Sequence, residues 1–145
     1  MNRKNIDAWI PIAIKEIQEL QIRKRTDKKE KEWGNGIPSR YFGYVDSFGP
    51  TIIQSGLRRA LTFYSEEDSQ ADRKEIASII QNVLKKGDVL KPGDNLKGLI
   101  NSMNDTNKFF WRNRILEAII ACKMALKLFH RVKPEEVKNK IEETT

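Results

Sequence analysis

Basic residues recur through residues 108–131 at spacings that would place them on one side of a helix. This stretch contains six Lys or Arg residues and a single carboxylate, that of Glu117. On a helix of about 3.6 residues per turn, five of the cations fall within an arc of about 140°. These five form the basic stripe: Lys108, Arg112, Lys123, Lys127 and Arg131. Because Lys and Arg neutralise the phosphates of nucleic acids, the spacing predicts a surface that follows a phosphate backbone.

Apolar residues interrupt the basic stripe. Phe109, Leu116, Ile119 and Ile120 lie among its cations, and apolar side chains on a charged face are typical of contact with another macromolecule. We therefore expect Phe109, Leu116 and Ile120 to contact a protein partner. Two other interpretations stay open from the residues alone: an ordinary solvated helix face, or a face covered by the shorter helices of the same chain.

Arg58 and Arg59 form a second group of cations, to which Arg40 is added. Guanidinium groups bind phosphates, pair with carboxylates and stack on aromatic rings. The three arginines are therefore candidates for phosphate binding, for pairing with the acidic segment 66–75, or for stacking on a tyrosine. The sequence favours none of these over the others.

Residues that could carry out catalysis are scarce. His130 is the only histidine, which excludes a pair of histidines for metal binding or acid–base chemistry. Cys122 falls on the apolar side of the predicted helix and is expected to be a small core residue. The acids of segment 66–75 stand where a helix begins and complement its dipole. We predict no catalytic site, metal, cofactor or small-molecule substrate; a metal-dependent nuclease that uses Asp68 or Asp72 is the enzymatic alternative.

The composition is that of a folded, basic protein. The chain has 145 residues, of which 39% are hydrophobic and 32% charged, and a net charge of +7. This length supports one hydrophobic core, so we expect a single helical domain over residues 1–145. The single cysteine indicates a reducing, cytoplasmic location. No stretch approaches the roughly 20 apolar residues of a membrane span, and no membrane association is expected.

Apolar residues spaced three and four apart predict one compact all-α bundle of five to six helices, with no strand. The first helix is expected to begin near Trp9, because Pro11 suits only a first turn, and to reach about Lys31. Its charged part, about residues 23–33, is expected to extend into solvent. A flexible tail is expected over residues 134–145.

The middle of the chain predicts a short helix over residues 38–47, followed by a longer one from Gly49-Pro50 to Tyr64. The apolar stripe of the longer helix includes Ile53 and Gly56. Glycine inside a helix costs about 1 kcal/mol relative to alanine. We therefore expect Gly56 to mark the close approach of another helix or of a partner.

Capping residues predict where the remaining helices begin. A capping box, Ser65 with Asp68 or Ser69 with Asp72, would start a helix that stops at residues 85–87. Asp94 would cap a short helix, and Asp105 or Thr106 would cap the last helix, which is expected to reach about Val132.

One segment carries a resemblance to a known family. Its motif is a Gly-Leu pair, then Ala-Leu three residues after that Leu, then an aromatic residue. Here these are Gly56-Leu57, Ala60-Leu61 and Phe63, with Tyr41 and Phe48-Gly49 ahead of them. The segment resembles the signature of the small α-helical subunit of the type III-B CRISPR RNA-targeting effector, the Cmr complex. The resemblance spans most of residues 7–132, and the small subunit of type III-A complexes is the related alternative.

The resemblance implies a non-catalytic protein of antiviral defence. Such subunits stack along a filament of larger backbone subunits and help to hold guide RNA (crRNA) and target RNA, while cleavage belongs to other subunits. The implied partners are therefore the other effector subunits, crRNA and target RNA. The basic stripe would then contact RNA, with Arg40, Arg58 and Arg59 as further candidates. A stand-alone basic helical module that binds nucleic acid is the runner-up.

Overall fold

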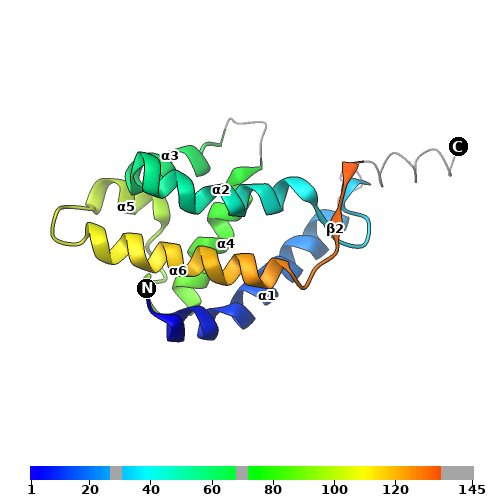
Figure 1. Cartoon of the computed structure of the whole chain (residues 1–145), viewed down its shortest axis with the longest axis horizontal. Coiled ribbons are helices and arrows are strands. Elements are labelled where there is room, and N and C mark those ends of the chain that lie inside the picture. Colours follow the sequence, from blue (N-terminus) through cyan, green and yellow to red (C-terminus); the bar gives the residue numbers. More distant parts are fainter. Residues whose placement is uncertain (27–30, 68–71, 135–145) are drawn as a thin grey trace, which may run out of the picture.

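The computed structural model describes residues 1–26, 31–67 and 72–134. In chain order the elements are α1 (Arg3–Thr26), the 3-10 turn η1 (Lys31–Trp33), β1 (Ile37–Pro38), α2 (Ser39–Ser55), α3 (Leu57–Tyr64), α4 (Arg73–Lys86), α5 (Leu96–Ser102), α6 (Lys108–Leu126) and β2 (Arg131–Val132) (Figure 1). The prediction of a compact all-α bundle of five to six helices is confirmed.

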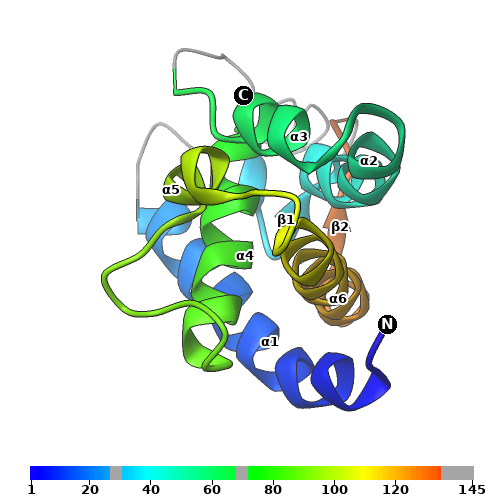
Figure 2. The ribbon, with the colours of Figure 1, turned by 90° about the vertical axis from the view of Figure 1, so that its left-hand side faces the viewer.

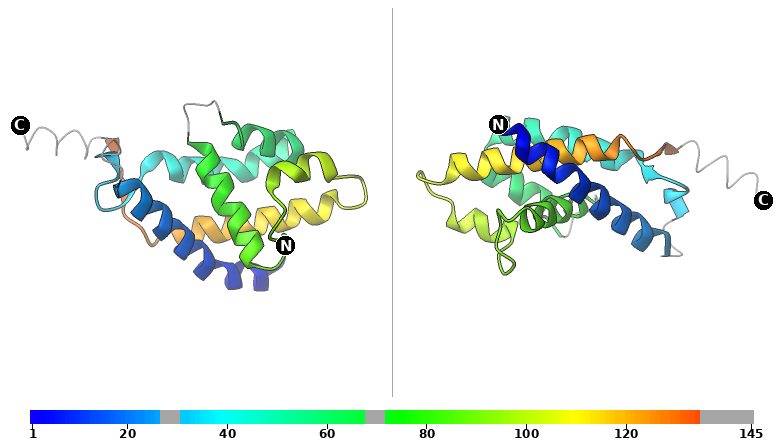
Figure 3. Two further views of the ribbon diagram at one scale, coloured as in Figure 1. Left: turned by 180° about the vertical axis from the view of Figure 1, so that it is seen from behind. Right: turned by 90° about the horizontal axis from the view of Figure 1, so that it is seen from below.

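The helices surround one hydrophobic core. α6 lies between α1 and α2, and α2 and α6 run alongside each other in opposite directions (Figure 1). α4 crosses behind α6 and packs on α1, α2, α3 and α6 (Figure 3). α3 packs on α5 at one end of the bundle (Figure 2). Each of the six helices contributes to the largest fully buried side chains: Trp33, Tyr41, Tyr64, Phe48, Ile17, Ile37, Ile52, Leu61, Ile80, Leu84, Leu96 and Ile115.

The first helix begins earlier than predicted. It starts at Arg3 and holds Pro11 in its interior, so the expected start near Trp9 is wrong. A proline in a helix interior removes a backbone hydrogen bond, and packing on both sides offsets that loss. Trp9 and Ala13, on either side of the proline, are both buried in the core.

A buried carboxylate also holds the start of α1. Glu117 on α6 is fully buried, and its Oε1 accepts hydrogen bonds from the Asn2 amide at 3.1 Å and from the Asn5 side chain at 3.3 Å. Its Oε2 lies 2.8 Å from Arg114 Nε. The only carboxylate of the basic stretch 108–131 is therefore used inside the fold, where it joins α6 to the first turn of α1.

The charged end of α1 differs from the predicted extension. The described helix ends at Thr26, and residues 27–30 lie outside the described part of the chain. The helix was predicted to reach about Lys31, but Lys31 begins the 3-10 turn η1 and is not part of α1. Trp33, at the end of that turn, is fully buried, with its ring centroid 5.0 Å from that of Tyr41.

The helix break in the middle of the chain lies at Gly56, and the predicted break at residues 48–49 is wrong. α2 continues through Pro50, which is exposed on the helix surface. Gly56 has φ +88° and ψ 157°, a region that is almost exclusive to glycine. A Cβ added there would meet nothing within 4 Å. The glycine is thus required by the backbone turn, and the expected close approach of another helix of this chain is wrong; approach by a partner stays a prediction. Ile53, expected in the core, is 64% exposed.

The last helix ends at Leu126, six residues before the predicted end at Val132. The chain turns there because residues 131–132 pair in parallel with β1, in the register Ile37 with Arg131. The prediction of no strand therefore misses this short pair. Gly36 permits the approach, since a Cβ on it would lie 2.0 Å from the His130 carbonyl oxygen. Of the predicted tail 134–145, residues 135–145 lie outside the described part.

The second half of the bundle begins with α4. The helix starts at Arg73, directly after Asp72, and ends at Lys86. Its end before Gly87 is as predicted. Both predicted capping boxes involve residues 68–71, which lie outside the described part of the chain.

Asparagines stand at the N-cap positions of the last two helices, and only Asn95 caps its helix through its side chain. The Asn95 side chain accepts a hydrogen bond from the Gly98 amide at 2.7 Å and so caps α5, where Asp94 was expected. Asn107 precedes α6, in place of the expected residues 105–106. Each observed N-cap position lies one or two residues after the predicted one. Several short polar residues stand at each helix start, and any of them suits the N-cap position.

Candidate nucleic-acid interface

α2 and α6 meet along a seam with contacts at three successive levels. The guanidinium carbon of Arg131 lies 5.1 Å from the ring centroid of Phe42, and Lys123 Nζ lies 3.4 Å from Asp46 Oδ1. Further along, Leu116 packs beside Gly49. These contacts align the two antiparallel helices. Their outward sides form one surface, here called the α2–α6 face, which carries Ile53 on α2 and Phe109, Arg112, Leu116, Ile120, Lys123, Met124, Lys127 and Arg131 on or just after α6.

The α2–α6 face mixes cations with exposed apolar side chains. The exposed fractions are 59% for Phe109, 64% for Ile53 and 44% for Met124. Among the described residues, Arg112 and Lys127 have no ion-pair partner. Their charges are therefore available to a ligand, and apolar surface is available beside them.

The apolar residues expected to contact a partner differ in how far α2 covers them. Phe109 is exposed, whereas Leu116 and Ile120 are half-buried. Ile119, which the sequence places among the cations, is only 4% exposed and belongs to the core. One interpretation open from the sequence was that other helices of the chain cover this side of α6. That is true for part of it.

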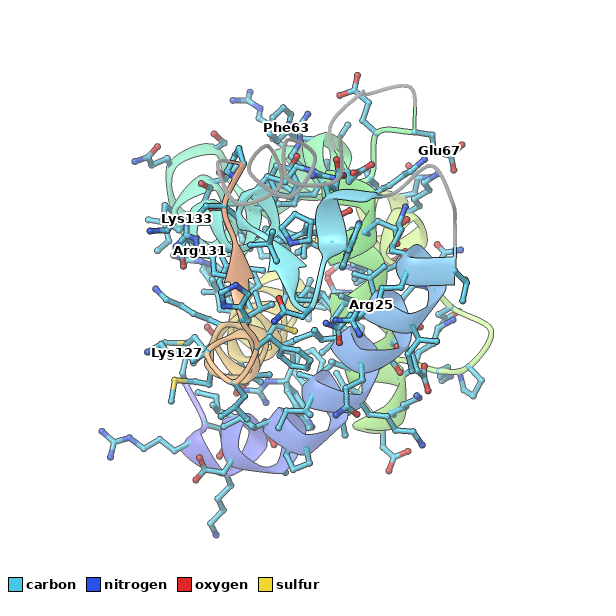
Figure 4. All side chains as sticks on the ribbon, turned by 90° about the vertical axis from the view of Figure 1, so that its right-hand side faces the viewer. Arg25, Phe63, Glu67, Lys127, Arg131 and Lys133 are labelled. Carbon is cyan, nitrogen blue, oxygen red and sulfur yellow. The ribbon has the colours of Figure 1, made fainter. Side chains whose placement is uncertain are left out.

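The basic stripe is not confined to one helix. Lys127 stands directly after α6, and Arg131 lies on β2, where its Nε donates to Ser39 Oγ at 2.8 Å. Lys127, Arg131 and Lys133 line one edge of the molecule, from the end of α6 along β2 (Figure 4). The chain's turn after α6 therefore extends the cations past the end of the helix.

A hollow of about 350 Å³ lies between the α2–α3 turn and the α5–α6 loop. It brings together Arg58 and Arg59 from one segment and Lys108 from another, all three candidates in the sequence. We call it the Gly56 hollow; its lining is Ser55, Gly56, Leu57, Arg58, Arg59, Met103, Asn104, Asp105 and Lys108.

The three cations of the Gly56 hollow are held differently. Arg58 donates from Nε to the Ile100 carbonyl at 2.8 Å and from Nη2 to the Met103 carbonyl at 3.1 Å. It therefore secures the end of α5 as well as lining the hollow. Lys108 pairs with Asp105 at 3.2 Å. Arg59 is exposed and has no ion-pair partner within the described ranges.

Arg40 lies away from both groups, in an ion-pair network. Its Nη2 is 2.6 Å from Glu32 Oε1 and 2.7 Å from Asp72 Oδ2, and its guanidinium lies over the Tyr41 ring at 4.8 Å. Burial alone would lower the pKa of Arg40, but the bonds to Asp72 and Glu32 outweigh it and raise the pKa. The sequence left three roles open to Arg40. The structure shows two of them: pairing with segment 66–75, through Asp72, and stacking on a tyrosine, Tyr41.

Cys122 and His130, the residues considered for catalysis, lie in different surroundings. Cys122 is buried at 2% exposure, as predicted, and burial raises the pKa of its thiol. His130 is exposed in the turn between α6 and β2. Within residues 1–26, 31–67 and 72–134, no group of three or more His, Cys, Asp or Glu side chains could hold a metal ion. None of the helices described is long and apolar enough to span a membrane.

A second, polar hollow of about 300 Å³ lies beside α4. Two of its three cations are paired within the protein: Arg23 with Glu75 at 2.6 Å and Lys97 with Glu67 at 2.7 Å.

Comparison with protein families matches residues 11–128 to the family described as CRISPR-associated protein (Cas_Cmr5). The chain belongs to this family. The resemblance to the type III-B Cmr small subunit is thereby confirmed, and membership makes the protein a subunit of a type III CRISPR effector. Searches of curated proteins and of solved structures gave no match.

The match to the Cas_Cmr5 family covers almost all of the α2–α6 face. It includes α2, α3 and α6 and both sides of the Gly56 hollow, and ends at residue 128. Arg131 and Lys133 lie just beyond it. Lys133 was not a candidate from the sequence; the signal that could have found it is its place two residues after Arg131, which in a strand puts both side chains on the same side.

Proposed function

We propose that this protein is a non-catalytic structural and RNA-binding subunit of the type III CRISPR effector. It stacks along the backbone filament and helps to hold crRNA and target RNA in the cytoplasm, without a cofactor or a small-molecule substrate. The α2–α6 face carries the proposal. It combines the exposed Phe109 with Arg112 and Lys127, which have no ion-pair partner among the residues the structure describes, as a surface that meets both RNA and protein requires.

The contacts divide by residue type along the face. Arg112, Lys123, Lys127 and Arg131 bind RNA phosphates; Lys123, Lys127 and Arg131 are exposed, and Arg112 is half-buried. Lys123 and Arg131 exchange their present partners, Asp46 and Ser39, for phosphate, and those exposed contacts are weak enough to be exchanged. The half-covered Leu116 and Ile120 contact the neighbouring subunit. Phe109, expected from the sequence to join them, is exposed at the start of α6 and open to either partner.

The experiment compares the assembled effector with and without the cations. The chain is coexpressed with the other subunits and crRNA, and target RNA affinity is measured over a range of salt concentrations. With Arg112→Glu and Lys123→Glu, the salt slope of binding should fall by about 0.7 to 0.9 for each phosphate that the variant no longer neutralises. The matched control is Lys4→Glu with Lys15→Glu, two exposed lysines on α1, on the other side of α6 from α2 (Figure 1).

Two results contradict the proposal. Unchanged affinity and slope in the Arg112 and Lys123 variant show that the α2–α6 face does not meet RNA. Failure of the chain to co-purify with effector subunits, together with tight RNA binding by the isolated chain, favours the stand-alone nucleic-acid-binding module instead.

A further inference from the structure

The Gly56 hollow adjoins an exposed aromatic ring. Lys108 lines the hollow, and its ammonium nitrogen lies 5.3 Å from the centroid of the Phe109 ring. More than half of Phe109 is open to solvent. A molecule that occupies the hollow and contacts Lys108 is therefore within reach of this ring.

The hollow is positive, and part of its charge is fixed in place. Its lining holds three cations and one carboxylate, that of Asp105, whose side chain is fully exposed. Arg58 is fixed by its bonds to the carbonyls of Ile100 and Met103. A guanidinium has more N–H donors than these two bonds use. The hollow therefore offers donors that are already in position for an anionic group.

We infer that the Gly56 hollow and Phe109 form a seat for one unpaired nucleotide of an RNA strand; the inference rests on the proposed function. The phosphate lies among Arg58, Arg59 and Lys108, and the base stacks on the Phe109 ring. Positive grooves with aromatic side chains bind single strands, because every base has a π-face that an aromatic ring can stack on.

Size and base accessibility distinguish the single strand from a duplex. The volume of about 350 Å³ lies at the lower end of small-ligand sites, which suits one nucleotide and not two paired strands. In a duplex the base faces are stacked on one another, and a protein meets mainly phosphates and 2′-hydroxyls. Phe109 can therefore contribute to binding only where the strand is unpaired.

The test separates the ring from the charges. Fluorescence anisotropy of the full chain at low ionic strength measures binding of an unstructured single-stranded RNA, and of the same RNA annealed to its complement. Phe109→Leu keeps an apolar side chain and removes the ring. It should weaken binding of the single strand by about 5- to 150-fold and leave binding of the duplex unchanged. Phe109→Trp should restore binding of the single strand.

The matched control is Phe63→Leu, since Phe63 is also an exposed aromatic residue, at 47%, and lies outside the lining of the hollow. It should change neither affinity. Equal losses for both RNAs with Phe109→Leu, or no loss for either, would overturn the inference. So would the absence of binding by the unsubstituted chain, because a preformed hollow needs no other subunit. The proposed function is judged separately, by the Arg112 and Lys123 variant in the assembled effector.

Discussion

Asn2 and Glu117, 115 positions apart, are joined by a 3.1 Å hydrogen bond from the Asn2 amide to Glu117 Oε1. The acceptor carboxylate is fully buried on α6, and its other oxygen lies against Arg114. A buried charge stabilises a fold only while its partners are present. The bundle therefore has a polar anchor between its first helix and its last.

Loss of this anchor should destabilise the protein. Glu117→Ala leaves the Arg114 guanidinium without its counter-charge and the Asn2 backbone amide without its acceptor, and we expect the free energy of unfolding to fall by about 3 kcal/mol. Urea unfolding followed by circular dichroism measures the change. Glu19→Ala, which removes an exposed carboxylate, is the control; equal stability of the two variants would show that the anchor contributes nothing.

Asp72 should make stability depend on acid pH. Burial raises the pKa of this carboxyl, but the hydrogen bonds from Arg40 and Tyr41 outweigh burial and hold the pKa below its ordinary value of 3.8. Because the pKa is lower in the folded state, the contribution to stability is complete above that ordinary value and is lost as pH falls through the folded value.

The measurement for Asp72 is the free energy of unfolding at a series of pH values from neutral down to about pH 3. Asp72→Asn should flatten the fall in stability in the acid range. Asp7→Asn, at an exposed position of α1, should follow the unsubstituted protein. An acid slope that is the same with and without Asp72 contradicts the assignment.

Three glycines should respond to alanine in three ways. Gly56→Ala should cost about 1–3 kcal/mol through its positive φ alone, since an added Cβ meets nothing there. Gly36→Ala should cost more than Gly56→Ala, because its Cβ would overlap the His130 carbonyl and separate β1 from β2. Gly43→Ala, in open space within α2, should stabilise by about 0.5–1 kcal/mol. Thermal unfolding ranks the variants, and any other order contradicts these roles.

Arg58 and Arg59 should separate stability from RNA binding. Arg58→Gln removes two hydrogen bonds to the carbonyls of Ile100 and Met103, and should lower the free energy of unfolding by about 1–2 kcal/mol. Arg59→Gln should leave stability unchanged and reduce the salt slope of RNA binding by about 0.7–0.9. Chemical denaturation and RNA titration of both variants provide the comparison. An Arg58 variant as stable as the unsubstituted protein would contradict the role of Arg58 in stability. An Arg59 variant with unchanged RNA binding would contradict the role of Arg59 in binding.

Periodicity alone predicted the core of α6, because Ile115, Ala118, Cys122 and Ala125 repeat at helical spacing and are all buried. It could not predict where α6 ends. That end depends on Ile37, whose amide donates to the His130 carbonyl at 2.8 Å, and a contact so distant leaves no local signal.

The cations were predictable as a group but not in their individual roles. Lys or Arg at helical spacing marks a charged face, yet a spacing does not specify which cation has a partner. Arg40 is paired by Asp72, Arg58 by main-chain carbonyls, whereas Arg59 and Arg112 have no such partner in the described part of the chain. The Gly56 hollow was equally hidden, because folding alone brings residues 55–59 beside residues 103–108.

The pairing of β1 with β2 has a consequence for the order of folding. Arg131 bonds to Ser39, 92 positions earlier in the chain, and closing so long a loop loses conformational entropy before its contacts can compensate. The cations beyond α6 therefore reach their places beside α2 only after the chain has folded from nearly one end to the other. A chain that has not yet closed this loop lacks the part of the basic edge that Arg131 contributes.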